Sequence, residues 1–171
     1  QFNSAQMMAD KWNLSRADME AYALRSHSRA LSAIEQGYFD REICPLNGIK
    51  MDETPRVTSL EKMAELEPIQ EGGSITAAVS SQTCDGASAV LVVSEDALKR
   101  YNLQPRARIA HMSVRGADPI WMLTAPIPAT AHALKKAGMS IHDIDLVEIN
   151  EAFAPVPMAW LAETGYDPDK T

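Results

Sequence analysis

An asparagine stands where an apolar segment changes into a helical pattern, and it is the residue best placed to do chemistry. Residues 146–149 are mostly apolar, which predicts a short strand. Asn150 follows directly, and Glu151 opens a helical pattern that continues through Leu161. In α/β sheets, ligands bind at the ends of strands, where an amide can hydrogen-bond to them. Because Asn is also a favoured helix N-cap, capping is the simpler interpretation of this stretch taken alone.

The other reactive side chains have contexts that do not favour catalysis. Cys84 precedes an Asp-Gly turn rather than opening a helix, so its context does not stabilise a thiolate, and we assign it a structural role. Cys44 and Cys84 lack C-x-x-C spacing, which argues against a zinc site or a disulfide framework. The four histidines are His27, His111, His132 and His142. None has metal ligands at a recurring spacing, so the sequence predicts no metal site.

The elements expected to position Asn150 are helices and strands in alternation. Helical periodicity is found over 1–12, 15–37, 58–66, 94–101 and 128–137. Strand patterns are found over 42–46, 87–93, 107–114 and 146–149. Because strand, helix, strand and helix follow one another in the second half, the sequence favours a right-handed βαβ unit in an α/β sheet.

Composition narrows the class of protein. The chain has 171 residues, 46% of them hydrophobic, which suits one ordinary core. Its net charge of -7, without a stripe of Lys or Arg, argues against nucleic-acid binding. No apolar run is long enough to cross a membrane, no signal peptide is visible, and we expect a cytoplasmic protein. The chain starts without Met and stops just after a helix and a turn, so we expect it to be part of a longer polypeptide.

Several short motifs lie in order along the whole chain. They are Ser-Arg at 15–16 with Ala-Leu-Arg-Ser-His at 23–27, Phe-Asp-Arg-Glu-Ile at 39–43, Asp-Glu at 52–53 with Arg56, Ser-Gln at 81–82 with Asp-Gly-Ala at 85–87, Ala-Pro-Ile-Pro-Ala at 125–129, and Val-Glu-Ile-Asn-Glu-Ala-Phe-Ala at 147–154. The last motif is highly specific. On these motifs the chain resembles the thiolase family, the acetyl-CoA acetyltransferases and 3-ketoacyl-CoA thiolases.

The resemblance implies a thiolase-like layered αβαβα fold, of which this chain would hold a part. Residues 1–75 would form the loop domain, 76–103 the end of the N-terminal half and 104–171 the start of the C-terminal half. Thiolases pair through the sheet edges of their N-terminal halves, so a homodimer or homotetramer is implied. Their substrates are acyl-CoA thioesters and coenzyme A, they carry no covalent cofactor, and the degradative members serve β-oxidation of lipids.

The resemblance also implies roles for individual residues. Asn150 matches the family asparagine that holds a water in an oxyanion hole facing the thioester oxygen, where a fixed donor stabilises developing charge by about 3 kcal/mol. Arg56 lies within one position of an arginine that contacts the phosphate or adenine of coenzyme A. The pantetheine and acyl tunnel should include Ser81, Met122, Ala152 and Phe153. Residues 80–82 and 122–124 resemble degradative thiolases acting on bulkier acyl groups.

The family's acylated cysteine lies upstream of Gln1, and its Gly-His-Pro histidine and second cysteine lie downstream of Thr171. Neither Cys44 nor Cys84 matches them, so we expect the chain by itself to be inactive. Three hypotheses follow from the sequence. The chain is a middle part of a degradative thiolase, a non-catalytic CoA-binding or structural module working with a partner chain, or a domain in which Asn150 only caps a helix.

Overall fold

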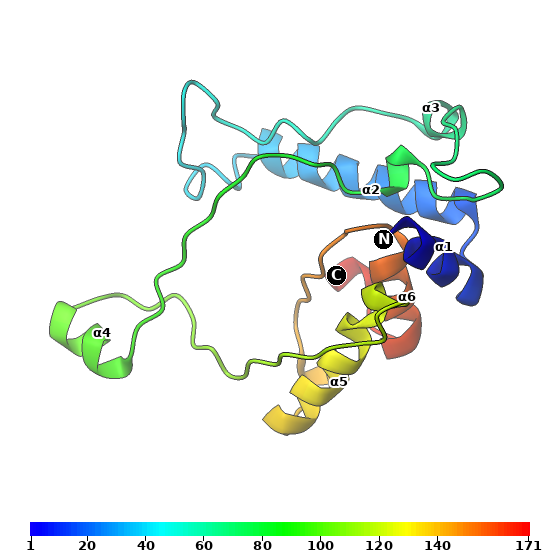
Figure 1. Cartoon of the computed structure of the whole chain (residues 1–171). Helices are drawn as coiled ribbons and strands as arrows, with labels where there is room; N and C mark the ends of the chain where they lie inside the picture. Colours follow the sequence, from blue (N-terminus) through cyan, green and yellow to red (C-terminus); the bar gives the residue numbers. More distant parts are fainter.

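The computed structural model describes all residues 1–171, and its regular structure is helical (Figure 1). The helices are α1 (Phe2–Lys11), α2 (Arg16–Glu35), α3 (Leu60–Ala64), α4 (Glu95–Tyr101), α5 (Pro126–Ala137) and α6 (Pro155–Thr164). Short 3-10 helices cover Ala77–Val79, Met122–Thr124, Ile141–Asp143 and Pro168–Lys170. Strand pairing is limited to two isolated antiparallel bridges, Leu46 with Ile49 and Ser80 with Phe153.

Helix α2 has the ends that the sequence predicts. The Ser15 hydroxyl accepts a hydrogen bond from the Asp18 amide at 3.1 Å, and the Asp18 carboxylate accepts one from the Ser15 amide at 3.3 Å. This reciprocal capping box satisfies two amides that would otherwise lack a partner. The helix ends before Gly37, whose φ of 69° is readily adopted by glycine. The long second helix is therefore confirmed.

The predicted strands are not formed. Residues 87–93, 107–114 and 146–149 have no strand partner and lie largely in solvent. Val90 is 86% exposed, Val114 95% and Leu146 77%. A strand pattern becomes a strand only when another strand supplies the hydrogen-bonding ladder, and no segment of residues 1–171 does so here. The βαβ unit and the layered arrangement predicted from the sequence are accordingly not seen in this chain.

The core lies between α1, α2, α6 and the segments beside them. It includes Met8, Met19, Val79, Phe153 and Ala159, all buried. Helix α4 stands apart, joined to the rest by two long extended segments (Figure 1). The accessible surface is 12510 Å², whereas a compact monomer of this mass would expose about 8,300 Å². Close packing is thus confined to the part of the chain that holds the candidate site.

Helix α3 is fastened to α2 by the side chain of Arg16. The Arg16 Nη2 atom lies 2.7–3.0 Å from the carbonyl oxygens of Met63, Ala64 and Leu66. These carbonyls belong to the end of α3 and the turn after it, where helical partners run out. The Arg16 Nε atom donates to Glu20, which is buried, at 2.7 Å. One guanidinium therefore fixes α3 and neutralises a buried carboxylate.

Helix α6 begins later than the sequence predicts, and this corrects the role of Asn150. The residue preceding the helix is Ala154, and Pro155 is its first residue. Proline is favoured there because the first helical amides have no partner to lose. The Ala154 amide instead donates to the Val79 carbonyl at 2.9 Å, which holds the segment before α6 outside the helix. Asn150 is not the cap of α6, so the capping interpretation is wrong.

Candidate functional site

One cleft of about 820 Å³ lies beside the Asn150 segment. Four parts of the chain line it together with Phe2 of α1, namely α2, residues 52–69, residues 77–84 and residues 150–154. The cleft exists because the bridge between Ser80 and Phe153 holds the third and fourth parts together, with a further hydrogen bond from the Ser81 amide to the Ala152 carbonyl at 3.0 Å. Arg16 holds the second part on α2 in the same way.

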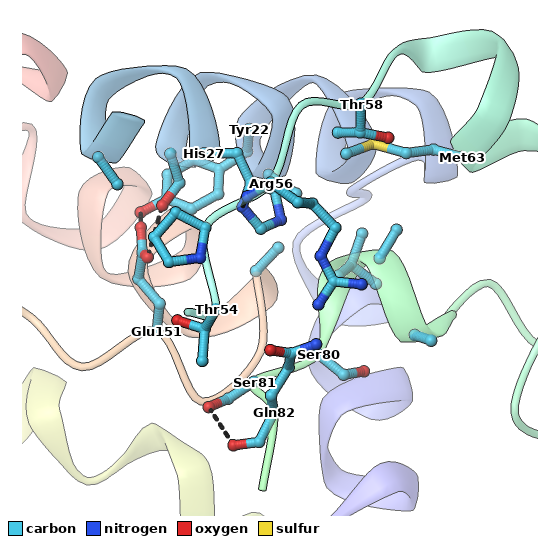
Figure 2. Close-up of a pocket in the computed structure, with 18 of the residues that line it drawn as sticks. Tyr22, His27, Thr54, Arg56, Thr58, Met63, Ser80, Ser81, Gln82 and Glu151 are labelled. Atoms are coloured by element: carbon cyan, nitrogen blue, oxygen red, sulfur yellow. Dashed lines mark hydrogen bonds between the residues drawn. The ribbon is translucent and has the colours of Figure 1, made fainter. Parts of the chain in front are cut away.

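Three of the predicted site residues line this cleft: Arg56, Ser81 and Asn150. All three are exposed in the chain, so each has polar atoms available to a ligand. Figure 2 shows the Arg56 side chain extending across the cleft toward Ser80 and Gln82. The structure thus brings an amide, a hydroxyl and a guanidinium to one hollow, although they are distant in the sequence.

The other three predicted residues do not line the cleft. Phe153 is buried, and its ring packs edge-to-face on Phe2 with centroids 5.6 Å apart. Ala152 takes part through its carbonyl, which accepts from Ser81. Met122 lies in the 3-10 helix that follows Trp121 and is 44% exposed. Phe153 and Ala152 support the cleft from behind, and the tunnel role of all three stays a prediction.

Both signs of charge are present in the cleft. Arg56 and Lys62 line it together with Asp52 and Glu151. Burial, with Arg56 nearby, lowers the pKa of His27 from its usual 6.5, although Glu151 opposes this shift. The neutral ring is consistent with its contact, since His27 Nδ1 accepts a hydrogen bond from the Arg56 amide at 3.4 Å. The mixture of cations and hydrogen-bond donors suits a ligand that carries phosphate groups.

Glu151 and Tyr22 form a polar contact that sequence reasoning did not single out. The Tyr22 hydroxyl donates to Glu151 Oε1 at 2.6 Å, and the Ser26 hydroxyl donates to Oε2 at 2.8 Å. Burial and then the Glu151 carboxylate raise the pKa of Tyr22 above its usual range, so its hydroxyl keeps its proton and donates. Tyr22 and Ser26 share one face of α2 at i, i+4 spacing, and Tyr22 also packs against the core cluster.

The two cysteines are both free and exposed. Cys84 lies at the cleft, whereas Cys44 is outside it. The Cys84 thiol is therefore not packed in a core of this chain, and its structural role stays a prediction. The structure holds no group of three His, Cys, Asp or Glu side chains arranged to bind a metal ion. None of its helices is both long enough and apolar enough to span a membrane.

We expect His27 to make stability depend on pH. Its folded pKa is depressed, so the folded state binds fewer protons than the unfolded chain below about pH 6.5. The stabilisation from neutral His27 is therefore present above that pH and is lost as the pH falls toward the folded pKa. Thermal melting of the full-length protein at successive pH values between about 7.5 and 5 should show a shallower decline for His27→Asn than for the unmodified protein. Equal slopes would contradict this assignment.

Comparison with known proteins now decides the family. The family model described as "Thiolase, N-terminal domain" matches residues 3–96, and "Thiolase, C-terminal domain" matches residues 103–171. This chain belongs to the thiolase family. The two matches together cover nearly the whole chain, while the domain limits at 75 and 103 stay predictions.

The chain is similar to several thiolases over almost its whole length. It is 58% identical to the steroid 3-ketoacyl-CoA thiolase FadA6 of Mycobacterium tuberculosis, over 99% of this chain and 43% of that protein. It is 42% identical to the mitochondrial 3-ketoacyl-CoA thiolase of Bos taurus, over 98% of this chain and 45% of that protein. The chain thus spans less than half the length of these relatives.

Solved thiolase structures have the same arrangement of backbone. The crystal structure of human mitochondrial 3-ketoacyl-CoA thiolase in complex with CoA superposes with a TM-score of 0.95 at 42% identity, over 98% of this chain and 44% of that one. The Bacillus anthracis acetyl-CoA acetyltransferase gives 0.92 at 38% identity, over 99% and 45%. The extended segments of this thiolase chain therefore follow paths that occur in complete thiolases.

Proposed function

We propose that this chain is part of a thiolase-type acyltransferase that moves acyl groups between a 3-ketoacyl-CoA or acetyl-CoA and coenzyme A. The observation that carries the proposal is the cleft in which Arg56, Ser81 and Asn150 meet. The Asn150 amide would hold a water against the thioester oxygen, where negative charge develops as the enolate forms. The Arg56 guanidinium would pair with a phosphate of the CoA substrate.

The acyl group would be carried on a cysteine outside residues 1–171. Neither Cys44 nor Cys84 matches the family's cysteines, and Cys84 lies at the cleft without a base beside it in the hydrogen-bond network. The chain would supply the CoA-facing wall and one oxyanion-hole residue, and other parts of the protein would supply the nucleophile and the acid/base groups. The unpaired segments 87–93, 107–114 and 146–149 would then be strands of the layered αβαβα fold, completed by those same parts.

For the substrate, we propose a 3-ketoacyl-CoA with a bulky acyl group. Support comes from the 58% identity to a relative named as a steroid 3-ketoacyl-CoA thiolase, against 42% for the bovine mitochondrial enzyme. Comparing kcat/KM for acetoacetyl-CoA with that for a polycyclic 3-ketoacyl-CoA tests the proposal, and preference for acetoacetyl-CoA would contradict it. A cytoplasmic location, a place in lipid β-oxidation and a homodimeric or homotetrameric assembly are part of the same proposal.

The decisive experiment measures turnover and CoA binding separately. Thiolysis of a 3-ketoacyl-CoA by the full-length protein, with calorimetric titration of CoA alone, should give both turnover and saturable binding. Binding without turnover would instead support a non-catalytic module, and addition of a partner chain would then be expected to restore the reaction. Failure to bind CoA would remove the basis for both functions.

Arg56 should govern binding rather than the chemical step. We expect Arg56→Ala to raise KM for CoA about tenfold, since one charge-assisted contact to phosphate is lost, and to leave kcat unchanged. Steady-state kinetics on the full-length protein measures both values. Arg108→Ala is the matched control, because Arg108 pairs with Glu95 on α4 and lies outside the cleft. Equal KM changes in the two variants would argue against a phosphate contact at Arg56.

A further inference from the structure

The segment that carries Asn150 has few attachments of its own. Residues 148–151 form no backbone-to-backbone hydrogen bond in this chain. The nearest such bonds lie on either side, from the Val147 amide to Lys170 and from the Ser81 amide to Ala152. The Asn150 side chain has no hydrogen-bond partner within the chain, which leaves its amide free for a ligand. Within residues 1–171, the attachment of this segment to α2 is therefore made by a side chain; in the full protein, residues 146–149 would also be paired as a strand.

That attachment is the carboxylate of the next residue. Both carboxylate oxygens of Glu151 accept hydrogen bonds, one from the Tyr22 hydroxyl at 2.6 Å and the other from the Ser26 hydroxyl at 2.8 Å. Figure 2 shows Glu151 reaching toward α2 beside Tyr22. We call these three residues the Glu151 clamp. Hydrogen bonds to a charged acceptor are roughly twice as strong as those between neutral groups. The two hydrogen bonds therefore attach Glu151 to α2.

The clamp ties a short irregular segment to a long helix. Tyr22 and Ser26 sit one turn apart on α2, whose start is fixed by the capping box at Ser15. A side chain held on a regular element is placed more accurately than one held only by a loop. The clamp also turns the negative charge of Glu151 toward two donors, which weakens its repulsion of an anion forming beside Asn150.

We propose that Glu151, through its hydrogen bonds to Tyr22 and Ser26, is a positioning residue that sets the place of the Asn150 amide in the oxyanion hole. This inference rests on the proposed function, since it assigns a task to the neighbour of a residue with a proposed catalytic role. The alternative hypothesis is that these hydrogen bonds only hold α2 against the segment before α6 and contribute to stability. The two differ in whether the clamp acts through Asn150.

A double-mutant cycle in the full-length protein distinguishes the positioning role of Glu151 from the purely structural one. The combined change Tyr22→Phe and Ser26→Ala removes both donors and keeps the helix-forming side chains. We expect it to lower kcat for thiolysis about tenfold or more, with KM for CoA changed less than about twofold. In the Asn150→Ala background, the same change should lower kcat less than about twofold, because the amide it positions is gone. An equal loss of kcat in both backgrounds would overturn the proposal.

Amide hydrogen exchange gives a readout that does not depend on turnover. The two amides that attach the Asn150 segment to residues 79–81, those of Ser81 and Ala154, should exchange about tenfold faster in the clamp variant than in the unmodified protein. Tyr166→Phe is the matched control, because it removes another partly buried tyrosine bond, to the Ile144 carbonyl at 2.7 Å. Exchange of these two amides unaffected by the clamp variant, or equally raised by the control, would overturn the proposal. An inactive unmodified protein would refute the proposed function alone, and exchange would still decide the clamp.

Discussion

Asn150→Ala in the full-length protein is expected to lower kcat for thiolysis by about 10²–10³, the usual effect of removing one oxyanion-hole donor. The amide lines the cleft and has no partner within the chain, so its loss removes a contact made only with substrate or water. Steady-state kinetics with a 3-ketoacyl-CoA measures the change. Affinity for CoA should stay within about twofold, because the phosphate contact proposed for Arg56 is separate.

The same variant should leave stability almost unchanged. A capping asparagine replaced by alanine would cost about 1 kcal/mol, but helix α6 begins at Pro155 and Asn150 does not cap it. Denaturant unfolding checks this. Asn102→Ala provides a comparison, since Asn102 follows α4 with φ of 49° and its replacement acts on stability alone. A variant at Asn150 that lost stability and kept its rate would refute the catalytic assignment.

Arg16→Ala is expected to lower the free energy of unfolding by about 2 kcal/mol, less than for a fully buried ion pair because the Arg16 side chain is partly exposed. The substitution leaves the buried Glu20 carboxylate without its partner and frees the carbonyls of Met63, Ala64 and Leu66. Because α3 and the residues beside it form one wall of the cleft, KM for CoA should rise as well. Chemical denaturation and steady-state kinetics of the full-length protein test both effects.

A matched control lies on the same helix. Arg29 pairs with Asp169 at 2.8 Å, but both side chains are exposed, so Arg29→Ala should cost less than about 1 kcal/mol. Adding Glu20→Gln to Arg16→Ala should recover part of the loss, since the buried charge is then gone. Equal destabilisation by Arg16→Ala and Arg29→Ala would show that burial of Glu20 is not the cause.

The sequence predicted those features of the fold that depend on residues close together in the chain, and it failed for those that depend on distant residues. The start of α2 and the end of α5 depend on neighbours in the chain, the capping box at Ser15 and Gly138, and both lie close to the predicted limits. The strand at 87–93 needs a partner strand, so its apolar pattern alone could not produce it. The start of α6 was misjudged because hydrogen bonds to residues 79–81, which no local pattern reveals, hold the preceding segment outside the helix.

Only some residues of the candidate site could be predicted from the sequence. Recognition of the family motifs led to Arg56, Ser81 and Asn150, which the structure places at one cleft. It did not lead to Tyr22, because an aromatic at helical spacing looks like a core residue until its partner is known. That partner, Glu151, is 129 positions away. Arg16 belongs to a recognised motif, but its task, holding α3, could be seen only in three dimensions.

The separation between Tyr22 and Glu151 has a consequence for how the protein is made. The two residues lie 129 positions apart, so at a synthesis rate of 5–20 residues per second Tyr22 leaves the ribosome about 6–26 s before its partner. In that interval α2 has nearer partners only, such as its capping box and then residues 63–66, which bind Arg16. Contacts this distant in sequence are late to close, because the intervening chain must be ordered first. The α2 wall of the cleft is therefore synthesised early, and the segment that carries Asn150 joins it later.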